Sequence, residues 1–401
     1  MLLTRNAPAL SRDIRLRSFG HISPFQLWGY TGFFLAFVLS SALVRPLGIS
    51  KLTLLGITGI VILTFYVLMM ITKIFAREEV IIYYHHEIAV LVTSTLFLRL
   101  TGQPVLPYLD VLVLGLGLFL GCGRIGCLLV GCCHGRPSKW GVEYGDEHVC
   151  TGFAYDLVGV RVFPVQVLES AFAFSIVACG LALLLRQHRP GSVLLFYVIA
   201  YGCGRFCLEF FRGDASRPYF RGFSEAQWTS LLLGMTALVA GKVKVLPEAR
   251  WHSPAVVAMV AGMVFVASRR HLDRSQRFEL LCPSHIREVS LALHQLTSLQ
   301  HKPLEPASMG SSGVVPIART SLGYKISAGC SAEGADLVEH FSISREGGAL
   351  SLKGARTLSD LLTRLMGHFG PFQLIQKNNG VFHVLIRCSQ KTVAQGHCPT
   401  S

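Results

Sequence analysis

Long apolar stretches separated by short polar segments occupy this chain as far as Arg270, and they constrain its fold more than any other feature. A helix that crosses the roughly 30 Å hydrocarbon core of a bilayer needs about 20 mostly apolar residues. Seven stretches are predicted to cross a membrane: 25–44, 52–71, 88–100, 109–132, 166–185, 193–211 and 228–243. An eighth, 255–267, is shorter and could instead lie at the membrane interface.

The composition agrees with a membrane protein, because 51% of the residues are hydrophobic and only 15% are charged. We therefore expect an all-α polytopic membrane protein with about seven transmembrane helices and a possible eighth. The basic segment 1–24 precedes the first stretch, as in a signal peptide. Because no small-residue cleavage site follows, the stretch is expected to remain as the first span.

The net charge of +14 could indicate a nucleic-acid partner. The Lys and Arg residues are scattered through the loops between spans, however, and do not form a stripe. Anionic lipid headgroups are the better match for such a distribution. We expect membrane lipids, and no nucleic acid, as partners.

The composition changes after Arg270, where a mixed polar and apolar sequence begins. We expect a transmembrane domain over 25–268, a linker over 269–313, rich in Pro, Ser and Gly from Lys302, and a small soluble α+β domain over 314–401. Its predicted elements are strands at 323–328 and 338–344, a helix at 357–366, and a hairpin of 372–375 with 381–386 that turns at Asn378-Asn379-Gly380. This domain has no recognisable catalytic signature.

Arg124 is the first candidate functional residue. It lies between Gly123 and Gly126 near the end of a membrane-length apolar stretch. A guanidinium group is costly in lipid, so an arginine at such a position usually marks a polar cavity or a bound anion.

A cysteine-rich segment follows directly, with Cys127, Cys132, Cys133 and His134. Thiolate and imidazole groups bind zinc, but the spacing is not the usual pair of ligands two to four residues apart. The sequence alone favours small side chains that fill gaps between closely packed helices. We therefore predict no metal and no cofactor.

A second polar group lies within the sixth apolar stretch. Tyr201, Arg205 and Glu209 recur at every fourth residue, which places a phenol, a guanidinium and a carboxylate on one helical face, with Arg212 on the same flank. An ion pair inside a membrane rarely stabilises a protein better than apolar packing would. Its presence therefore favours a function over a purely structural role.

Polar residues also open the fifth stretch, where Gln166 and Glu169 follow Pro164 and lie about one helical turn apart. A proline is tolerated in the first turn of a helix, so the helix is expected to begin there. Both side chains should face the interior of the bundle.

Together these three motifs resemble the prolipoprotein diacylglyceryl transferase family in order and spacing. The family signature G-R-x-G-N-F-x-N-x-E-x-x-G is matched by Gly123, Arg124, Gly126 and Gly135. Two further family elements, Pro-x-Gln-x-x-Glu and Tyr-Gly-x-x-Arg-Phe-x-x-Glu-Phe-x-Arg, are matched by Pro164, Gln166, Glu169, Tyr201, Gly202, Arg205, Phe206, Glu209, Phe210 and Arg212. The resemblance covers roughly residues 25–243.

The resemblance implies transfer of the diacylglyceryl group of phosphatidylglycerol to the lipobox cysteine of a preprolipoprotein signal peptide, with release of glycerol phosphate. Arg124 and Arg205 would hold the phosphate as its C–O bond breaks, with Arg212 as a third cation. Glu209 would orient Arg205, and Tyr201 would donate a hydrogen bond. The resemblance also assigns substrate binding to Gln166, Glu169, Gly126 and Gly135, and it implies a multi-pass protein of the bacterial inner membrane.

The chain departs from the family at the predicted base and in the signature. The family has a His-Gly-Gly element where this chain has Tyr83-Tyr84-His85-His86-Glu87, so His85, or else His86, is the candidate for the catalytic histidine. Tyr30 lies near a family tyrosine in the first span. Cys127, Val130 and Cys132 stand where the family has two asparagines and a glutamate.

These replacements leave two alternatives open. The first is a lipid-modifying transferase with a different acceptor, which could pass its group through one of the three cysteines as a covalent carrier. The second is a non-catalytic lipid-binding membrane protein whose tail recruits a partner. The positive-inside rule places the amino terminus inside, whereas the family has it outside.

Overall fold

The structure is a computed structural model of the chain. It describes residues 22–76, 83–186, 189–215, 217–273, 277–300, 315–333, 336–368, 370–377 and 380–388. Most of the basic segment 1–24, the stretch 302–313 and the turn residues Asn378 and Asn379 lie outside these ranges.

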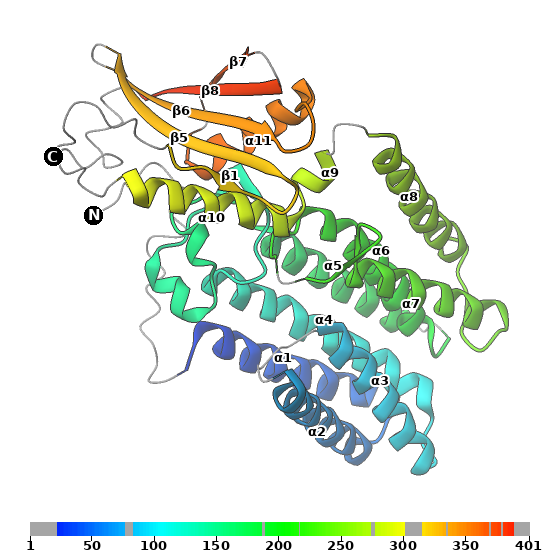
Figure 1. Cartoon of the computed structure of the whole chain (residues 1–401). Helices are drawn as coiled ribbons and strands as arrows, with labels where there is room; N and C mark the ends of the chain where they lie inside the picture. The colour runs from blue at the N-terminus through cyan, green and yellow to red at the C-terminus, as the bar shows by residue number, and fades with distance from the viewer. Residues whose placement is uncertain are drawn as a thin grey trace.

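Eight long helices form the apolar part of the described chain (Figure 1). They are α1 (Pro24–Leu47), α2 (Lys51–Ala76), α3 (Tyr83–Leu100), α4 (Val105–Val130), α5 (Val165–Leu185), α6 (Ser192–Leu208), α7 (Glu225–Lys242) and α8 (His252–Leu272). Each of the seven predicted stretches falls largely within one of the helices α1 to α7, and the eighth falls within α8.

Among the described residues, six helices are long and apolar enough to cross a membrane: α1, α2, α4, α5, α8, and α6 extended to Phe211. The eighth stretch, which is short in the sequence pattern, lies in a 21-residue helix that meets this criterion. Helices α3 and α7 have 18 residues each and do not meet this criterion of length and hydropathy. The chain is therefore a multi-pass helical membrane protein, as predicted.

Two of the helices begin with the same side-chain motif. At the start of α1, Ser23 accepts a hydrogen bond from the Gln26 backbone, and the Gln26 side chain accepts one from the Ser23 N–H. Ser224 and Gln227 form the same capping box at the start of α7. The box satisfies N–H groups that have no partner within the helix, which fixes where the helix begins.

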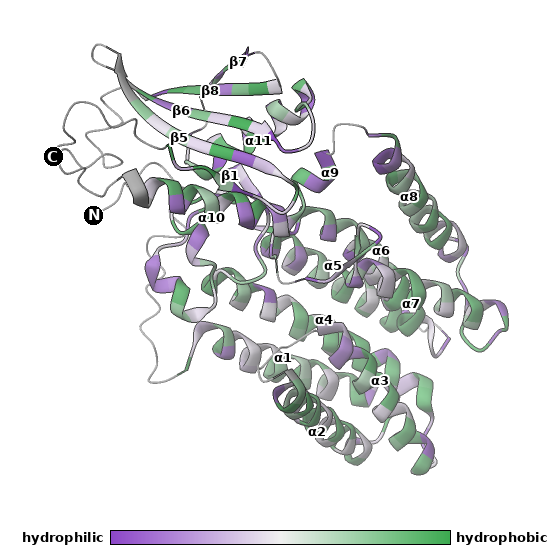
Figure 2. Cartoon of the chain, in the orientation of Figure 1, coloured by the Kyte–Doolittle hydropathy of each residue, from purple (hydrophilic) through white to green (hydrophobic). Residues whose placement is uncertain are grey.

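Helix α4 is the centre of the bundle and the most buried of the spans. Small residues permit close approach of its neighbours: a Cβ at Gly32 of α1 would lie 2.8 Å from the Cβ of Cys122, and Ser170 of α5 donates a hydrogen bond to the Gly121 carbonyl. Hydrophobic residues predominate on the helices of this bundle. The strands at the other end of the molecule carry both hydrophobic and hydrophilic residues (Figure 2).

Short elements connect these helices on the side where α4 ends. They are β1 (Pro137–Val142), η1 (Asp146–Thr151) and η2 (Tyr155–Leu157) between α4 and α5, and η3 (Glu209–Phe211), β2 (Tyr219–Phe220) and β3 (Phe223–Ser224) between α6 and α7. We call residues 131–164, between α4 and α5, the site loop.

The carboxy-terminal part forms the predicted small α+β unit. Its described elements are α9 (Arg277–Leu280), α10 (Pro283–Gln300), β4 (Ala318–Arg319), β5 (Tyr324–Glu333), β6 (Asp336–Arg345), α11 (Leu352–Leu365), β7 (Gln373–Lys377) and β8 (Val381–Cys388). The strands form an antiparallel sheet in the order β4-β5-β6-β8-β7. The predicted strands, helix and hairpin are all present, while α9 and α10 occupy part of the predicted linker 269–313.

One hydrophobic core joins this unit to the site loop. Tyr144, Phe153 and Leu157 of the loop are buried in the same cluster as Leu293 of α10 and Leu358 of α11. Helix α10 lies between the sheet and the helical layer (Figure 1). The tail therefore packs directly on the segment that follows the signature motif.

Candidate functional site

Glu169, in the first turns of α5, is at the centre of a buried ionic cluster. Its carboxylate forms ion pairs with Arg124 of α4 at 3.0 Å and with Arg212 at 3.1 Å, and it also pairs with Arg205 of α6. Three separate segments of the chain therefore meet at one side chain. Removal of one partner from such a buried group is costly, because the remaining charges are left without compensation.

The cluster continues through a second set of pairs. Arg205 also contacts Glu209 at 2.8 Å, one helical turn further on, as predicted. Arg217 bridges Glu209 at 2.8 Å and Asp214 at 2.7 Å, and Asp214 in turn contacts Arg212 at 2.8 Å. The ion pairs thus form a closed ring through both motifs.

When Arg124, whose ion pair among the described residues is with Glu169, is counted with it, the ring contains more positive than negative charge. In the described part of the chain it includes the four guanidinium groups of Arg124, Arg205, Arg212 and Arg217 and the three carboxylates of Glu169, Glu209 and Asp214. One positive charge is therefore in excess. Since Arg212 is fully buried and Arg124 and Arg205 nearly so, this charge acts where water screens it weakly.

Asp214 remains ionised within the ring. Burial alone would raise the pKa of its carboxyl group, but the Arg212 and Arg217 guanidinium groups hold that pKa well below its usual range. Asp214 therefore contributes one of the three negative charges of the ring at neutral pH.

Close backbone contacts hold the two arginine-bearing segments together. Gly135 pairs with Arg212 in an antiparallel bridge, and the Gly213 N–H donates to the His134 carbonyl at 3.0 Å. A Cβ on Gly135 would lie 2.6 Å from the Phe163 carbonyl oxygen, and one on Gly213 would lie 2.3 Å from that of Gly135. Only glycine fits at these two positions.

Gln166 and Gly126 support the cluster from outside the ring. The Gln166 amide donates to the Cys132 carbonyl oxygen at 2.8 Å and so ties the site loop to α5. Gly126 faces the first turns of α1, where an added Cβ would lie 3.1 Å from the Cα of Phe25. In the structure both residues contact the protein's own backbone.

A narrow pocket of about 50 Å³ reaches the ring from between α3, α6 and α7. Arg205 and Tyr201 line it on α6, and Glu87 lines it on α3. The Tyr201 ring stacks on that of Tyr197, with centroids 5.6 Å apart. The pocket places a phenol and a guanidinium next to each other, as the sequence predicts.

Three other candidate residues from the sequence lie outside the ring. His85 is half-exposed at the start of α3, and its Nε2 atom lies 3.3 Å from Glu225 at the start of α7. His86 is buried against the Phe65 ring. Tyr30 is 60% exposed on α1.

Three polar residues of the site are not predicted from the sequence. Arg217 and Asp214 follow the last matched motif and have no helical period that would reveal them. Glu87 is next to the two candidate histidines, but its burial among aromatic residues depends on the packing of α3 against α6. An acidic residue inside an apolar stretch was the available signal for Glu87.

The structure also brings three thiols together beside the ring. The sulfur atoms of Cys127, Cys132 and Cys133 all lie within 4.8 Å of one another. His134 does not join them among the described residues, and its Nδ1 atom donates to the Gly135 carbonyl at 2.8 Å. Burial lowers the pKa of His134, which keeps this imidazole neutral.

The fold and the site define a class of protein: a polytopic helical membrane protein with an arginine-rich ionic cluster inside its bundle. A family model described as "Prolipoprotein diacylglyceryl transferase" matches residues 18–241, more than half of the chain. The chain belongs to the prolipoprotein diacylglyceryl transferase family.

Similar proteins carry the same name. The phosphatidylglycerol–prolipoprotein diacylglyceryl transferase of Clostridium tetani is 33% identical over 146 residues, which are 36% of this chain and 55% of the relative. Enzyme 2 of that name from Clostridium perfringens is 35% identical over 34% of this chain and 50% of the relative. A third relative, from Dehalococcoides mccartyi, is 31% identical over 32% of this chain and 48% of its own length. The chain thus spans about half the length of the curated relatives it matches.

Proposed function

We propose that this protein transfers the diacylglyceryl group of phosphatidylglycerol to the cysteine thiol of a prolipoprotein lipobox and releases glycerol phosphate. The observation that carries the proposal is the buried ring with one positive charge in excess. A phosphodiester monoanion complements this charge. Family membership and the printed names of the relatives support the same reaction.

Arg124 and Arg205 would stabilise the leaving phosphate, and Arg212 would add to the field. As the bond between the glyceryl carbon and the phosphate oxygen breaks, negative charge grows on that oxygen, so fixed guanidinium groups stabilise the transition state more than the ground state. Glu209 and Glu169 would orient the arginines, and Tyr201 would donate a hydrogen bond to the headgroup. Gln166, Gly126 and Gly135 would shape the cavity.

His85 is the proposed acceptor of the thiol proton. It is half-exposed and lies beside the pocket that Arg205 lines. The signal peptide would approach from the membrane between α3 and α7, where this pocket opens. Tyr30, exposed on α1, would contact lipid.

We propose a bacterial inner-membrane location and eight membrane crossings. Helices α3 and α7 pack between other spans, so an antiparallel order of eight crossings places both the start of α1 and the tail on the side of the ring. We further propose that the carboxy-terminal unit begins at α10, within the predicted linker 269–313, because α10 shares the core of the sheet.

A specific observation keeps a second candidate open. Cys127, Val130 and Cys132 replace the amide and carboxylate side chains of the family signature, and these changes alter the wall of the cavity. A lipid transferase with a different acceptor would use the same arginines.

The test is a reaction of the purified protein with labelled phosphatidylglycerol and a lipobox peptide, followed by mass spectrometry of peptide and protein. We expect a diacylglyceryl adduct on the peptide cysteine. Arg124→Ala and Arg205→Ala should each lower the rate by at least about 100-fold, because each removes a donor to the leaving phosphate. Arg161→Ala is the control, since Arg161 pairs with Glu143 outside the ring. Full activity in both ring variants would overturn the mechanism.

A further inference from the structure

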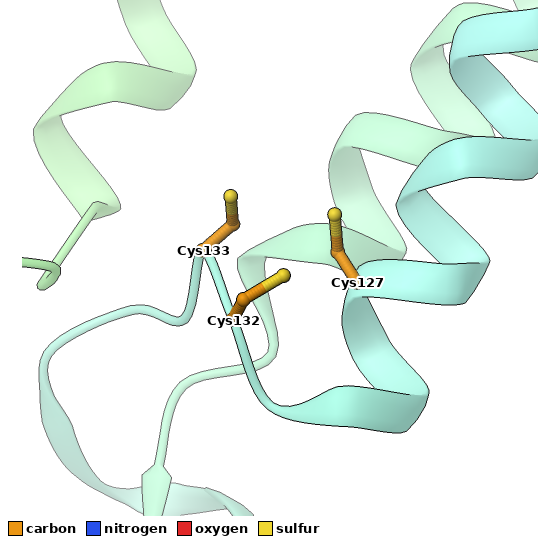
Figure 3. Close-up of side chains that lie close together, drawn as sticks. All are labelled: Cys127, Cys132 and Cys133. Carbon is orange, nitrogen blue, oxygen red and sulfur yellow. The ribbon is translucent and has the colours of Figure 1, made fainter. Parts of the chain in front are cut away.

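The three thiols beside the ring have no role in the reaction described so far. Cys127 is in the last turn of α4, and Cys132 and Cys133 follow in the site loop (Figure 3). The side chain of Cys132 points toward that of Cys127, and the sulfurs of Cys127 and Cys133 point the same way (Figure 3). Cys127 is buried, while Cys132 and Cys133 are partly accessible.

The backbone turn after α4 brings the three thiols together. Gly131 ends α4 in the left-handed conformation, and Cys133 adopts a positive φ of 59°, which a residue with a Cβ rarely does. Gln166 fixes the carbonyl of Cys132. The turn therefore returns two adjacent cysteines to the helix that carries the third, which the sequence spacing alone does not reveal.

The geometry fits a thiophilic metal ion. Zn–S bonds of about 2.3 Å at tetrahedral angles separate the sulfur atoms by about 3.8 Å. The sulfur atoms here already lie within 4.8 Å of one another, so small side-chain rotations close the site. Three protein ligands and an open fourth position are typical of catalytic zinc sites, whereas structural sites use four.

The electrostatic surroundings favour such a site. Nearby positive charge favours a thiolate over a thiol, and the neighbouring ring is rich in guanidinium groups. Arg124 and Arg212 of the ring lie within electrostatic range of Cys133. These guanidinium groups therefore favour the thiolate form of the cysteine ligands.

We propose that Cys127, Cys132 and Cys133 bind Zn²⁺, and that its open position takes the acceptor cysteine as a thiolate. This inference rests on the proposed transferase function. It supplies the activation of the thiol in a chain that lacks the His-Gly-Gly element of its family and whose His85 pairs with Glu225. A metal ion lowers the pKa of a coordinated thiol and so deprotonates it at neutral pH.

The step balances without any redox partner. The thiol proton leaves to water, and the sulfur then forms a bond to the glyceryl carbon of phosphatidylglycerol. The C–O bond to the phosphate breaks, and the electron pair leaves with the phosphate oxygen held by the arginines. Ligation suits these cysteines better than a covalent carrier role, because a thioether formed on the protein has a poor leaving group for a second transfer.

Metal content of the purified full chain tests the site independently of turnover. We expect about one zinc per chain in the wild type and below about one tenth in Cys127→Ser, Cys132→Ser and Cys133→Ser. Cys179→Ser is the matched control, because Cys179 is exposed on the same bundle, and it should keep its zinc. A wild-type protein without bound metal, or with a disulfide among the three cysteines, would overturn the proposal.

Cobalt-substituted wild-type protein tests the open position and needs no variant that might fail to fold. Addition of the lipobox peptide should change the ligand-field absorption of Co²⁺, and the same peptide with serine for cysteine should leave it unchanged. Identical spectra with both peptides would overturn the proposed thiol activation. Transfer by a zinc-free protein would refute this inference and leave the transferase function intact. Bound zinc without transfer would support the metal site and refute the transferase function.

Discussion

Glu169 shows how one residue can organise a site that its motif does not single out. In the sequence it is one carboxylate among several and is assigned to substrate binding. In the structure it joins Arg124, Arg205 and Arg212 from three segments. The arginines are predictable because each is conspicuous in an apolar stretch. Their shared partner is not, since only the packing of α5 between α4 and α6 creates the contact.

Glu169→Gln therefore has a large expected cost. The amide keeps the shape but removes the charge that three buried guanidinium groups share, so we expect a loss of about 3–5 kcal/mol in unfolding free energy and loss of transfer. Thermal unfolding of the purified protein in detergent measures the first effect. Glu143→Gln, in the partly exposed pair with Arg161, should cost at most about 1 kcal/mol. Equal shifts for the two variants would contradict a central role of Glu169.

At the scale of elements, the sequence predicts the helices well and the connections poorly. Apolar stretches and capping residues such as Ser224 identify where spans lie and begin. Helix α10 falls in the predicted linker although Ile286, Val289, Leu293 and Leu296 recur at helical spacing and are all buried. The linker is predicted from the Pro, Ser and Gly content further along the chain, and this helical spacing is not used. The crossing of the site loop with the segment after α6 depends on glycines whose role is visible only in three dimensions.

Gly135→Ala tests that crossing. The new methyl group would lie within 3 Å of the Phe163 carbonyl oxygen and the Phe211 carbonyl oxygen, so the two segments must separate. We expect a loss of roughly 1–3 kcal/mol in stability and a strong loss of transfer. In the control Gly123→Ala, no atom lies within 4 Å of the new Cβ, and alanine favours the helix. Both variants are compared by thermal unfolding and by the lipobox assay. A Gly135→Ala protein with unchanged stability and unchanged transfer would contradict the packing argument.

At the scale of the whole molecule, the tail and the membrane part form one structure through the site loop. The shared core includes Tyr144 and Phe153 on one side and Leu358 and Phe382 on the other. In addition, the Arg364 guanidinium donates to the Pro137 carbonyl at 3.4 Å. Such contacts join residues about 200 positions apart, which no local pattern reveals. For this reason the sequence predicts the tail as a separate unit.

Leu358→Asp should therefore impair a reaction that takes place far from α11. A buried carboxylate at this fully buried position would detach α11 from the core, loosen the site loop and lower transfer by at least about tenfold. Leu352→Asp is the matched control on the same helix, because Leu352 is 48% exposed in the first turn. Limited proteolysis of the site loop, together with the transfer assay, separates the two variants. Unchanged transfer in Leu358→Asp would show that the loop holds its shape without the tail.

The shared core also has a consequence for synthesis on the ribosome. The site loop ends at residue 164, but its packing partner is complete only after strand β8 has been made. At about 5–20 residues per second, translation of the intervening chain takes on the order of 10–45 s. During that interval all the membrane helices can be inserted, while the carboxy-terminal unit that packs on the site loop is still incomplete. We expect the newly made protein to become competent only once its last strand has left the ribosome.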